Sequence, residues 1–535
     1  MHRTPHPEAY DAVVVGAGFA GLYMLHKLRA IGLRAVVLEA GDDIGGTWHW
    51  NRYPGARCDV ESLEYSYSFD EQLQHEWRWA ERYAPQPEIL RYIHHVADRF
   101  DLRRDIRLDT RVVAAARDEA ANRWTVTTAS GDAFSCQYCI MAVGCLSLPS
   151  LPPFKGRDSF TGKLYHTGLW PREGVDFSGQ RVGVIGTGSS GIQAIPELAR
   201  QARHLYVFQR TPHYSLPAFN RPLSDAEFEA HRAQYPALRE RARHSRIGVS
   251  NFPVPDKSAL EVDASERSAA YEGGWNRGST GFTRLYKDLL TSAPANATAA
   301  GFVRDKIQGL VHDPRVAQQL TPDYAIGIKR LCLQTGYFDA YNRDNVTLVD
   351  VKNAPIESIV PDGIQTRTQH YALDAIVLAT GYDAVTGALN NIDIRNGDGA
   401  ALSAKWAEGP RAYLGLMSAG YPNLFLVTGP GSPSILANVV MAIEQHVEWI
   451  ADCLQHLRSQ GFARIDASAQ AEADWVQEVN AIAHRTLLPT ANSWYMGANI
   501  PGKPRVFMPY AGGLGDYRAR CEQIVQRGYT GFRLA

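Results

Sequence analysis

The chain has 535 residues, with 55 basic and 56 acidic side chains and a formal net charge of −1. That length is enough for about three domains of ordinary size. The balanced charge gives no basic field for nucleic acid, and no apolar run approaches the roughly 18 residues that cross a bilayer. We therefore expect neither a nucleic-acid partner nor a membrane segment.

The first ten residues are polar, contain two prolines and lead directly into an apolar strand, which is not the layout of a signal peptide. The seven cysteines are widely spaced and odd in number, which argues against a disulfide framework. These features predict a cytoplasmic protein. The balanced surface charge permits a monomer.

A strand–turn–helix pattern occurs twice. The apolar runs 11–15 and 181–185 each meet a G-x-G-x-x-G turn, and helices are expected over 22–32 and 192–201. In such a turn one glycine makes the bend, one lets backbone N–H groups approach a pyrophosphate, and one lets helix and strand pack closely. The helix N-terminus adds positive potential. Two copies predict two dinucleotide sites.

The residue that follows the second strand of each unit separates the two ligands. Glu39 lies 23 residues after Gly16, where a carboxylate accepts from a ribose 2′-hydroxyl and excludes a 2′-phosphate. Arg210 lies 24 residues after Gly186, and its guanidinium suits a phosphate. The pattern predicts FAD at the first site and NADPH at the second. An ordinary solvated arginine is the alternative for Arg210.

Two similar apolar strands, 139–144 and 375–381, both end in Ala-x-Gly, one before the second glycine-rich turn and the other well after it. They predict an FAD domain interrupted by an inserted NADPH domain, with hinges near Gly144 and Gly381. Between them a charged, Ala-rich stretch opens at Ser224 with capping-box spacing, which predicts helices.

The expected fold is therefore α/β, with two Rossmann-like dinucleotide-binding domains and a mainly helical insertion in the NADPH domain. The FAD domain is assigned to residues 1–145 and 383–535, the NADPH domain to 146–215 and 324–382, and the helical subdomain to 216–323.

Cys136 and Cys139 form a C-x-x-C pair, which raises a second interpretation, an FAD- and NADPH-dependent disulfide reductase. Redox use favours a cysteine at a helix N-terminus, whereas Cys139 opens a strand and strand alternation places the two thiols on opposite faces. Strand packing is therefore the preferred explanation. No H-E-x-x-H or clustered Cys/His set occurs, so we expect no metal.

The segment before the second glycine-rich turn carries Phe160, Gly162, His166, Trp170 and Pro171. Its turn glycines and Trp-Pro pair suit a stiff linker between two nucleotide domains. It also resembles, residue for residue, the F-x-G-x-x-x-H-x-x-x-W-P fingerprint of type I Baeyer–Villiger monooxygenases, which are class B flavoprotein monooxygenases.

The resemblance covers nearly the whole chain and is strongest to the phenylacetone and steroid monooxygenase branch. The segments that carry it are 45–48, 51–59, 86–90, 329–330, 342–346, 429–434, 493–495 and 501–507. Thr47 stands where this family often has valine, and Ile435 stands where it has a smaller residue. Both departures bear on the range of substrates and not on the reaction.

The resemblance implies NADPH- and O₂-dependent oxidation of a small-molecule ketone to an ester or lactone through an FAD C4a-peroxide, with a side activity on sulfides. It implies Arg330 as the catalytic cation beside the peroxide and Asp59 as its partner. Ser434 and Ile435 are implied in the substrate pocket. Trp494 is implied on a mobile loop over the nicotinamide, with a plain core tryptophan as the alternative.

The resemblance and the glycine-rich turns together imply two sets of cofactor contacts. The FAD set is Gly16, Gly18, Phe19, Ala20, Gly21, Glu39, Gly46, Thr47, Trp48, Asp59, Tyr65 and Val112. The NADPH set is Arg57, Gly186, Thr187, Gly188, Ser189, Ser190, Gly191, Ile192, Gln193, Arg210, Thr211, Lys329, Arg330 and Trp494.

Two further functions stay open at this point. A flavin-dependent monooxygenase that oxidises nitrogen or sulfur uses related chemistry, and analysis of the product separates it from a ketone oxidase. A catalytically silent FAD- and NADPH-binding sensor is expected to have lost Arg330 or Asp59. Both are present, which disfavours the sensor.

Overall fold

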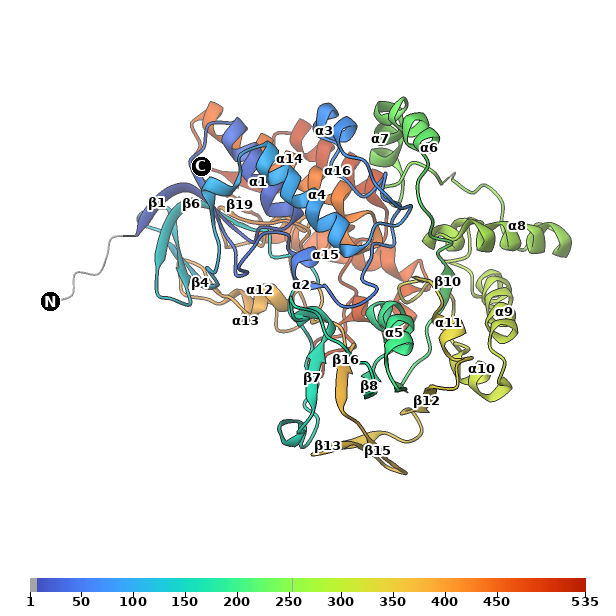
Figure 1. Ribbon diagram of the computed structural model, residues 1–535. Coiled ribbons are helices and arrows are strands. Elements are labelled where there is room, and N and C mark those ends of the chain that lie inside the picture. Colours follow the sequence, from blue (N-terminus) through green and yellow to red (C-terminus); the bar gives the residue numbers. More distant parts are fainter. Residues whose placement is uncertain (1–6, 253) are drawn as a thin grey trace.

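The computed structural model describes residues 7–252 and 254–535, so the expectation about the leading residues falls largely outside it. Two parallel-rich sheets dominate the structure, and helices cover them (Figure 1). Within the described ranges, no helix is both long enough and apolar enough to cross a membrane.

The larger sheet is built from both ends of the chain. Its strand order is β17-β4-β5-β6-β1-β2-β3, and β18 pairs with β6. The strands are β1 (Glu8–Val15), β2 (Ala35–Leu38), β3 (Ile106–Arg107), β4 (Val112–Asp118), β5 (Arg123–Thr128), β6 (Ala133–Met141), β17 (Asp393–Arg395) and β18 (Leu424–Leu426). β1 runs parallel to β2 and β6 at the centre, where both faces are buried.

The smaller sheet has the order β12-β9-β8-β16-β7. Its strands are β7 (Lys163–His166), β8 (Arg181–Ile185), β9 (His204–Gln209), β12 (Val346–Asp350) and β16 (Ala375–Leu378). β16 returns beside β8 almost 200 residues after it and pairs with it in parallel. The helical segment lies between β9 and β12 in the chain, so strands that follow this segment complete the sheet.

Smaller sheets of two or three short strands complete the architecture. A three-stranded sheet of β13 (Ile356–Val360), β14 (Gly363–Thr366) and β15 (His370–Ala372) packs on one face of the smaller sheet. The remaining pairs are β10 (Ser215–Pro217) with β11 (Cys332–Gln334) and β19 (Ile465–Ala467) with β20 (Phe532–Leu534).

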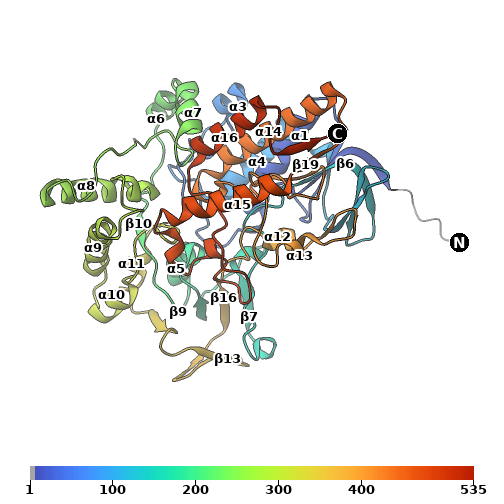
Figure 2. The same cartoon turned by 180° about the vertical axis from the view of Figure 1, so that it is seen from behind.

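Helices from distant parts of the chain cover the larger sheet. α1 (Phe19–Ala30) packs against α14 (Val439–Gln460), and α4 (Gln86–Arg99) shares the same hydrophobic core. Figure 2 shows α14, α15 (Ala469–His484) and α16 (Leu514–Gln526) together above this sheet. The shorter helices are α2 (Thr47–Trp50), α3 (Glu71–Glu76), α11 (Tyr337–Ala340), α12 (Gly387–Asn390) and α13 (Leu402–Lys405).

The segment between β10 and β11 contains helices and no described strand. These are α6 (Asp225–Arg232), α7 (Tyr235–His244), α8 (Ala264–Arg277), α9 (Ala293–Leu310) and α10 (Pro314–Leu320), drawn in green to yellow in Figure 1. Ser224 accepts from the Glu227 backbone N–H and completes a capping box, as its spacing predicts. α7 packs against α16, so this segment reaches back to the C-terminal part of the chain.

Three helices begin at positions that differ from the sequence expectation. α1 starts at Phe19 and α5 (Ser189–Gln201) at Ser189, three residues earlier than expected in each case. The third glycine of each turn therefore lies inside the helix, because Gly18 and Gly188 already serve as the N-caps. The sequence also predicts a long amphipathic helix that begins near Leu436, but α14 starts at Val439, after a short 3₁₀ turn at Ser434–Leu436.

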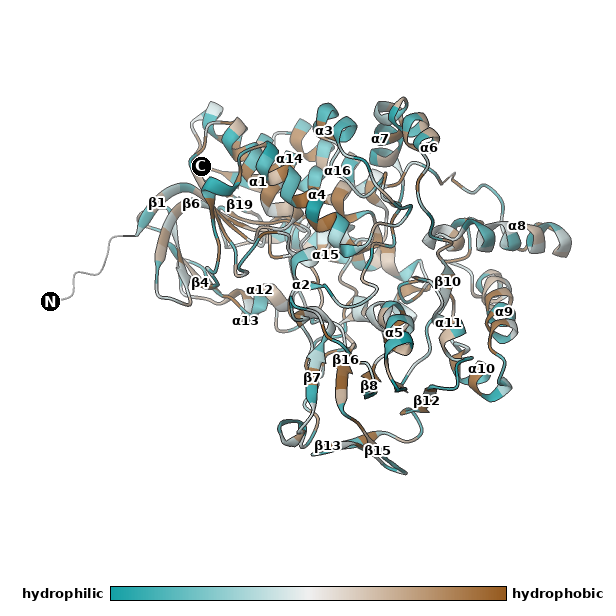
Figure 3. Ribbon diagram, viewed as in Figure 1, coloured by the Kyte–Doolittle hydropathy of each residue, from teal (hydrophilic) through white to brown (hydrophobic). Residues whose placement is uncertain are grey.

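Each of the two main sheets has a buried hydrophobic core on both of its faces. β16 is apolar throughout and β8 has no polar side chain after Arg181; both are drawn mainly in brown in Figure 3, and residues of both are buried. Val182 and Val184 face α5, while Ile185 faces the three-stranded sheet. Gly144 and Gly381, the expected hinge glycines, both have a positive φ, of 75° and 77°, which suits glycine.

Candidate active site

A cavity of about 950 Å³ lies where the two main sheets approach one another. Val15 and Gly16 at the end of β1, and Ile185 and Gly186 at the end of β8, all line it. Both glycine-rich turns therefore open into one space. This is the expected position for ligands in parallel α/β sheets, beyond the carboxyl ends of the strands.

The turn after β1 is shaped for close approach of a ligand. Gly18 caps α1 and supplies no side-chain acceptor, so the first N–H groups of the helix remain for a ligand. A Cβ on Gly46 would lie 2.9 Å from the Gly18 Cα, so side chains here would fill the cradle. These features fit a bound pyrophosphate.

Glu39 follows β2 at the edge of this cradle. Its carboxylate accepts from the backbone N–H of Ala17 at 2.7 Å and of Gly41 at 2.8 Å. Burial raises the pKa of Glu39, and these two N–H groups oppose that shift by stabilising the anion. The geometry holds a carboxylate in a fixed place beside the cavity, as ribose recognition requires.

The turn after β8 repeats this arrangement with different charges. Gly188 lines the cavity, and a Cβ built on it would meet no atom within 4 Å, so open space lies directly in front of the helix cap. Arg210 follows β9 and lines the same cavity together with Thr211 and Lys329.

Lys329 lies close to another cation. Burial lowers the pKa of Lys329, and the charge of Arg210 lowers it further. The Lys329 ammonium also lies 4.5 Å from the centre of the Tyr324 ring. Two cations that converge on a cavity fit an anion such as a 2′-phosphate, because the anion removes their mutual repulsion.

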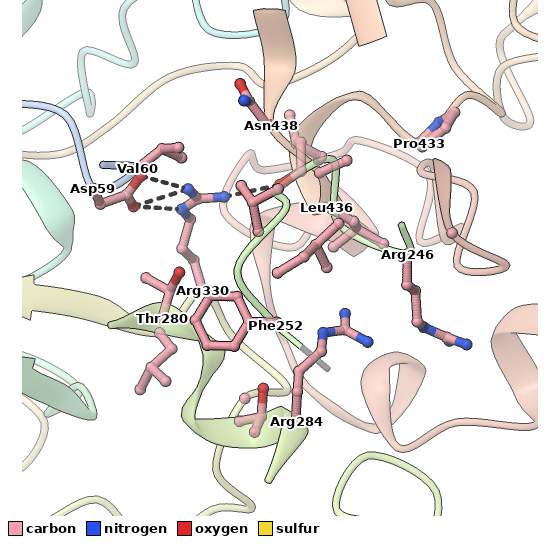
Figure 4. A pocket seen from close by; sticks show the side chains of 18 of the residues that line it. Asp59, Val60, Arg246, Phe252, Thr280, Arg284, Arg330, Pro433, Leu436 and Asn438 are labelled. Carbon is pink, nitrogen blue, oxygen red and sulfur yellow. Dashed lines mark hydrogen bonds and ion pairs between the residues drawn. The ribbon is translucent and has the colours of Figure 1, made fainter. Parts of the chain in front are cut away.

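Arg330 and Asp59 form a two-point ion pair at the centre of the cavity. Arg330 Nε donates to Asp59 Oδ2 at 3.0 Å, and Nη2 donates to Oδ1 at 2.8 Å. Nη1 donates to the Ile435 carbonyl at 2.8 Å (Figure 4). The charge of Asp59 raises the pKa of Arg330, and burial opposes this shift without reversing it. The guanidinium is therefore a fixed, permanent cation.

A hydrogen-bond network ties the loop that carries Asp59 to the second unit. Tyr53 Oη donates to Gln193 Oε1 at 2.8 Å, and Gln193 Nε2 donates to the Arg57 carbonyl at 3.0 Å. Gln193 lies on α5, so the loop at 51–59 and the second glycine-rich turn are held as one unit. Arg57 Nη1 in turn pairs with Glu81 at 3.0 Å.

Known proteins resemble this chain over its full length. A family model described as "Pyridine nucleotide-disulphide oxidoreductase" matches residues 13–232. A Baeyer–Villiger monooxygenase of Pseudooceanicola batsensis is 43% identical over 97% of this chain and 95% of its own length. The chain belongs to the Baeyer–Villiger monooxygenases.

Solved structures agree with this family. The structure "Oxidized steroid monooxygenase bound to NADP" is 52% identical, covers 98% of this chain and 99% of its own, and superposes with a TM-score of 0.94. The complex of OTEMO with FAD and NADP is 41% identical, covers 99% of this chain and all of its own, and has a TM-score of 0.95. The expected α/β fold and Baeyer–Villiger family are thus confirmed.

Most of the expected cofactor residues of this Baeyer–Villiger family member converge on the large cavity. Those that line it from the FAD set are Gly16, Gly18, Phe19, Ala20, Glu39, Gly46, Thr47, Trp48, Asp59, Tyr65 and Val112. Those from the NADPH set are Arg57, Gly186, Thr187, Gly188, Ser189, Ser190, Gln193, Arg210, Thr211, Lys329, Arg330 and Trp494. Trp494 is half-buried there, next to the buried Tyr495.

Three expected cofactor residues do not line the cavity. A Cβ on Gly21 would lie 1.8 Å from the Gly16 carbonyl oxygen, and one on Gly191 would lie 2.3 Å from that of Gly186. These glycines allow helix and strand to pack closely. Ile192 is fully buried in the core beneath α5.

Ser434 and Ile435, both expected in the substrate pocket, differ in their placement. Ser434 is 2% exposed and lines neither the large cavity nor the smaller one beside it. Its neighbour Ile435 lines both. The 3₁₀ turn at this point directs one of the two side chains into the core and the other toward the ligand space.

The family fingerprint lies in and around β7, at the edge of the smaller sheet, and not in the wall of the large cavity. None of Phe160, Gly162, His166, Trp170 and Pro171 lines the large cavity. A Cβ on Gly162 would lie 2.3 Å from the Asp374 carbonyl oxygen. His166 ends β7, is 3% exposed, and accepts from the Gly168 N–H at 2.9 Å. The fingerprint therefore shapes the chain crossing beside β16.

The two cysteines of the C-x-x-C pair do not face opposite sides of their strand. Cys136 and Cys139 are both fully buried in β6 and belong to the same core cluster. Alternation ends at Gln137, after which four consecutive residues are buried because the centre of the sheet is covered on both faces. Neither thiol lines the large cavity. A disulfide reductase has no accessible dithiol here.

Sequence reasoning missed several residues of the cavity wall. Asn51, Tyr53, Tyr382 and Asn499 all line it. Tyr382 Oη donates to the Asn51 side chain, and Asn499 Nδ2 donates to the Tyr382 carbonyl at 2.7 Å, which anchors the loop after Trp494. Two of these residues lie in the 51–59 segment that carries the resemblance, which is the signal that could have identified them.

Among residues 7–252 and 254–535, no group of three or more His, Cys, Asp or Glu side chains is placed to hold a metal ion.

Proposed function

We propose that this protein is an NADPH-dependent, FAD-containing Baeyer–Villiger monooxygenase that converts a ketone into an ester or lactone. The overall reaction consumes the ketone, O₂, NADPH and one proton, and yields the ester, NADP⁺ and water. The observation that carries the proposal is the Arg330–Asp59 ion pair between the two glycine-rich turns. Family membership supports the same reaction.

FAD, once reduced by NADPH, supplies the activated oxygen for this reaction. The chain's own residues hold and orient the reactants. Glu39 fixes the first ribose, while Arg210, Thr211 and Lys329 hold the 2′-phosphate that distinguishes NADPH from NADH. The backbone N–H groups at the starts of α1 and α5 bind the two pyrophosphates.

Arg330 is the residue that acts on the reacting atoms. One Nη1–H is given to the Ile435 carbonyl. Arg330 also lines both cavities, where its guanidinium can donate to an oxyanion of the substrate. A permanent cation in a partly dry site stabilises negative charge as it develops on the substrate oxygen. Asp59 fixes the guanidinium through two hydrogen bonds and acts as a positioning residue.

We also propose the domain boundaries that the sequence predicts. We assign residues 1–145 and 383–535 to an FAD domain, 146–215 and 324–382 to an NADPH domain, and 216–323 to a helical subdomain. We also propose a monomer in the cytoplasm. Size-exclusion chromatography with light scattering tests the first of these two, and cell fractionation tests the second.

The decisive experiment separates flavin reduction from oxygen insertion. Arg330→Ala is expected to leave anaerobic reduction of the flavin by NADPH measurable and to abolish ester formation. Arg395→Ala, at an exposed position outside both cavities, is the matched control and should retain both steps. Ester synthesis by Arg330→Ala would refute the role given to Arg330. Product mass and structure distinguish an ester from a sulfoxide or N-oxide when mixed substrates are supplied.

A further inference from the structure

A second cavity of about 150 Å³ adjoins the large one and shares Asp59, Arg330 and Ile435 with it. It extends away from the cofactor residues between the helical segment and the C-terminal part of the chain. Phe252, Leu290 and Leu436 contribute apolar wall. Because Arg330 stands at its inner end, this cavity is the space in which a substrate carbonyl can meet the catalytic cation.

Two further arginines line this cavity. Arg284 ends the 3₁₀ helix Thr280–Arg284, and Arg246 follows α7. Figure 4 shows both at the end of the cavity away from the Arg330–Asp59 pair. Arg246 is exposed and donates to the Ala511 carbonyl at 2.9 Å, whereas Arg284 is half-buried. The cavity therefore has a cation at each end.

Arg284 has no protein partner for its charge. In the described part of the chain its guanidinium makes no hydrogen bond and no ion pair, although it carries five N–H donors. Burial lowers the pKa of Arg284 to about 10, and the positive charge of Arg246 contributes to the shift. Removing a guanidinium from water beside a second cation is costly unless an anion compensates.

Each acidic residue of the same cavity has a partner other than Arg284, although the buried Oε2 of Glu64 has no hydrogen-bond partner among the described residues. Asp59 is bound by Arg330 at 2.8 Å, and Glu61 accepts from Arg82 at 2.8 Å. Glu64 accepts from the Ser250 N–H at 3.0 Å.

One carboxylate on α16 lies near Arg246. The positive charge of Arg246 helps to lower the pKa of Asp516. The Asp516 carboxylate, however, already accepts hydrogen bonds from Tyr510 Oη and, at 2.8 Å, from Arg520 Nε. The positive end of the cavity is thus left for a ligand.

We propose that the substrate is a ketone that carries a carboxylate, with its carbonyl at Arg330 and its carboxylate at Arg284. This inference rests on the proposed function and deepens it. The planar guanidinium of Arg284 suits a carboxylate through two parallel hydrogen bonds. Arg246, at the exposed end, attracts the anion and guides it inward. The carboxylate is not altered in the reaction; oxygen is inserted only beside the carbonyl.

The cavity volume limits the size of the ligand. A cavity of about 150 Å³ holds a molecule of roughly the size of benzene. We therefore expect a short keto acid, with one chain length preferred, because the two cations stand at fixed ends of the cavity.

The test compares each keto acid with its primary amide, which has nearly the same shape and no charge. A series of straight-chain methyl keto acids of increasing length is offered to the holoenzyme, and kcat/KM is measured from NADPH consumption and product mass. We expect the acid to exceed its amide by about tenfold or more at the preferred length, from the strength of a charge-assisted hydrogen bond. Equal values for acid and amide at every length would overturn the inference.

Variants of the two arginines provide a second test of the same acid-to-amide ratio of kcat/KM, and Arg284→Gln is the central one. It should reduce the acid-to-amide ratio to about one, while Arg246→Gln should reduce it less and mainly at low salt, because Arg246 is exposed. Arg395→Gln should leave the ratio unchanged. An Arg284→Gln variant that keeps the full preference would refute the assignment. If this variant does not fold, Arg284→Lys, which keeps the charge and loses the two-point geometry, must still lower the ratio.

The experiment distinguishes a failure of the carboxylate inference from a failure of the proposed function. If no ketone, charged or neutral, yields an ester, the proposed function fails. If neutral ketones yield esters and keto acids show no advantage, only the inference about the carboxylate fails.

Discussion

Arg330 and Asp59, which are 271 residues apart in the chain, are joined by hydrogen bonds of 2.8 to 3.0 Å. Arg330 precedes β11, and Asp59 lies in the loop after α2. The pair therefore forms only when the first and second dinucleotide units are packed together. Its geometry links the presence of a catalytic cation to the assembly of the whole site.

Asp59→Asn should keep the shape of this contact and remove its charge. We expect kcat for ester formation to fall by about tenfold to a hundredfold, since truncating one partner of a buried pair costs about 2–5 kcal/mol and Arg330 is partly exposed. Steady-state kinetics checks this, and a variant with wild-type kcat would contradict the positioning role of Asp59.

Arg210→Gln should raise KM for NADPH by about ten- to a hundredfold, because it removes a charged hydrogen-bond donor worth about 1.5–3 kcal/mol. KM for NADH should change little, since NADH has no 2′-phosphate. Parallel titrations with both nucleotides make the comparison. Equal effects on the two would remove Arg210 from the phosphate site.

Two glycines of one turn should respond in opposite ways. Gly188→Ala places a methyl group in open cavity space, so the thermal midpoint should stay near the wild-type value while KM for NADPH rises about tenfold or more. Gly191→Ala places its methyl 2.3 Å from the Gly186 carbonyl oxygen, so the protein should lose about 1–3 kcal/mol of stability. Calorimetry together with NADPH kinetics distinguishes them. Similar behaviour of the two variants would contradict the division of roles.

His446 predicts a pH dependence of stability. Its Nδ1 accepts from the Thr428 N–H at 2.9 Å, and Nε2 lies 2.9 Å from Tyr517 Oη. Burial lowers the pKa of His446 to about 3, so the folded state binds fewer protons than the unfolded state below pH 6.5. Its contribution is complete above pH 6.5 and is lost as the pH falls toward 3.

The free energy of unfolding of the wild type should therefore fall by an amount of order 1–3 kcal/mol from this residue between pH 6.5 and 4, and the thermal midpoint should fall with it. His446→Gln should be less stable at neutral pH and should show a weaker dependence on pH. Half-buried His213, whose pKa desolvation lowers to about 4, contributes in the same direction and remains in both proteins. An identical slope in the two proteins would exclude His446 as a source.

Some residues of the site were predictable because local rules place them. Glu39 and Arg210 each follow the second strand of a unit, and parallel strands bring such positions to one edge of a sheet. The burial of Cys136 and Cys139 in one core cluster was not predictable in this way, because local alternation does not reveal which layers cover a strand. The inward direction of Ile435 rather than Ser434 likewise depends on a short 3₁₀ turn.

The sequence alone determined the two dinucleotide units, their order, the charge that separates the two ligands, and the family. These depend on residues that are close in the chain, so that spacing and residue type are sufficient. Only the tertiary structure decided that Arg330 meets Asp59, and that Arg284 and Arg246 face a shared cavity without a described carboxylate partner. Those relations depend on segments that are not neighbours in the chain, and the distances and desolvation that give them their energy exist only after the layers have packed.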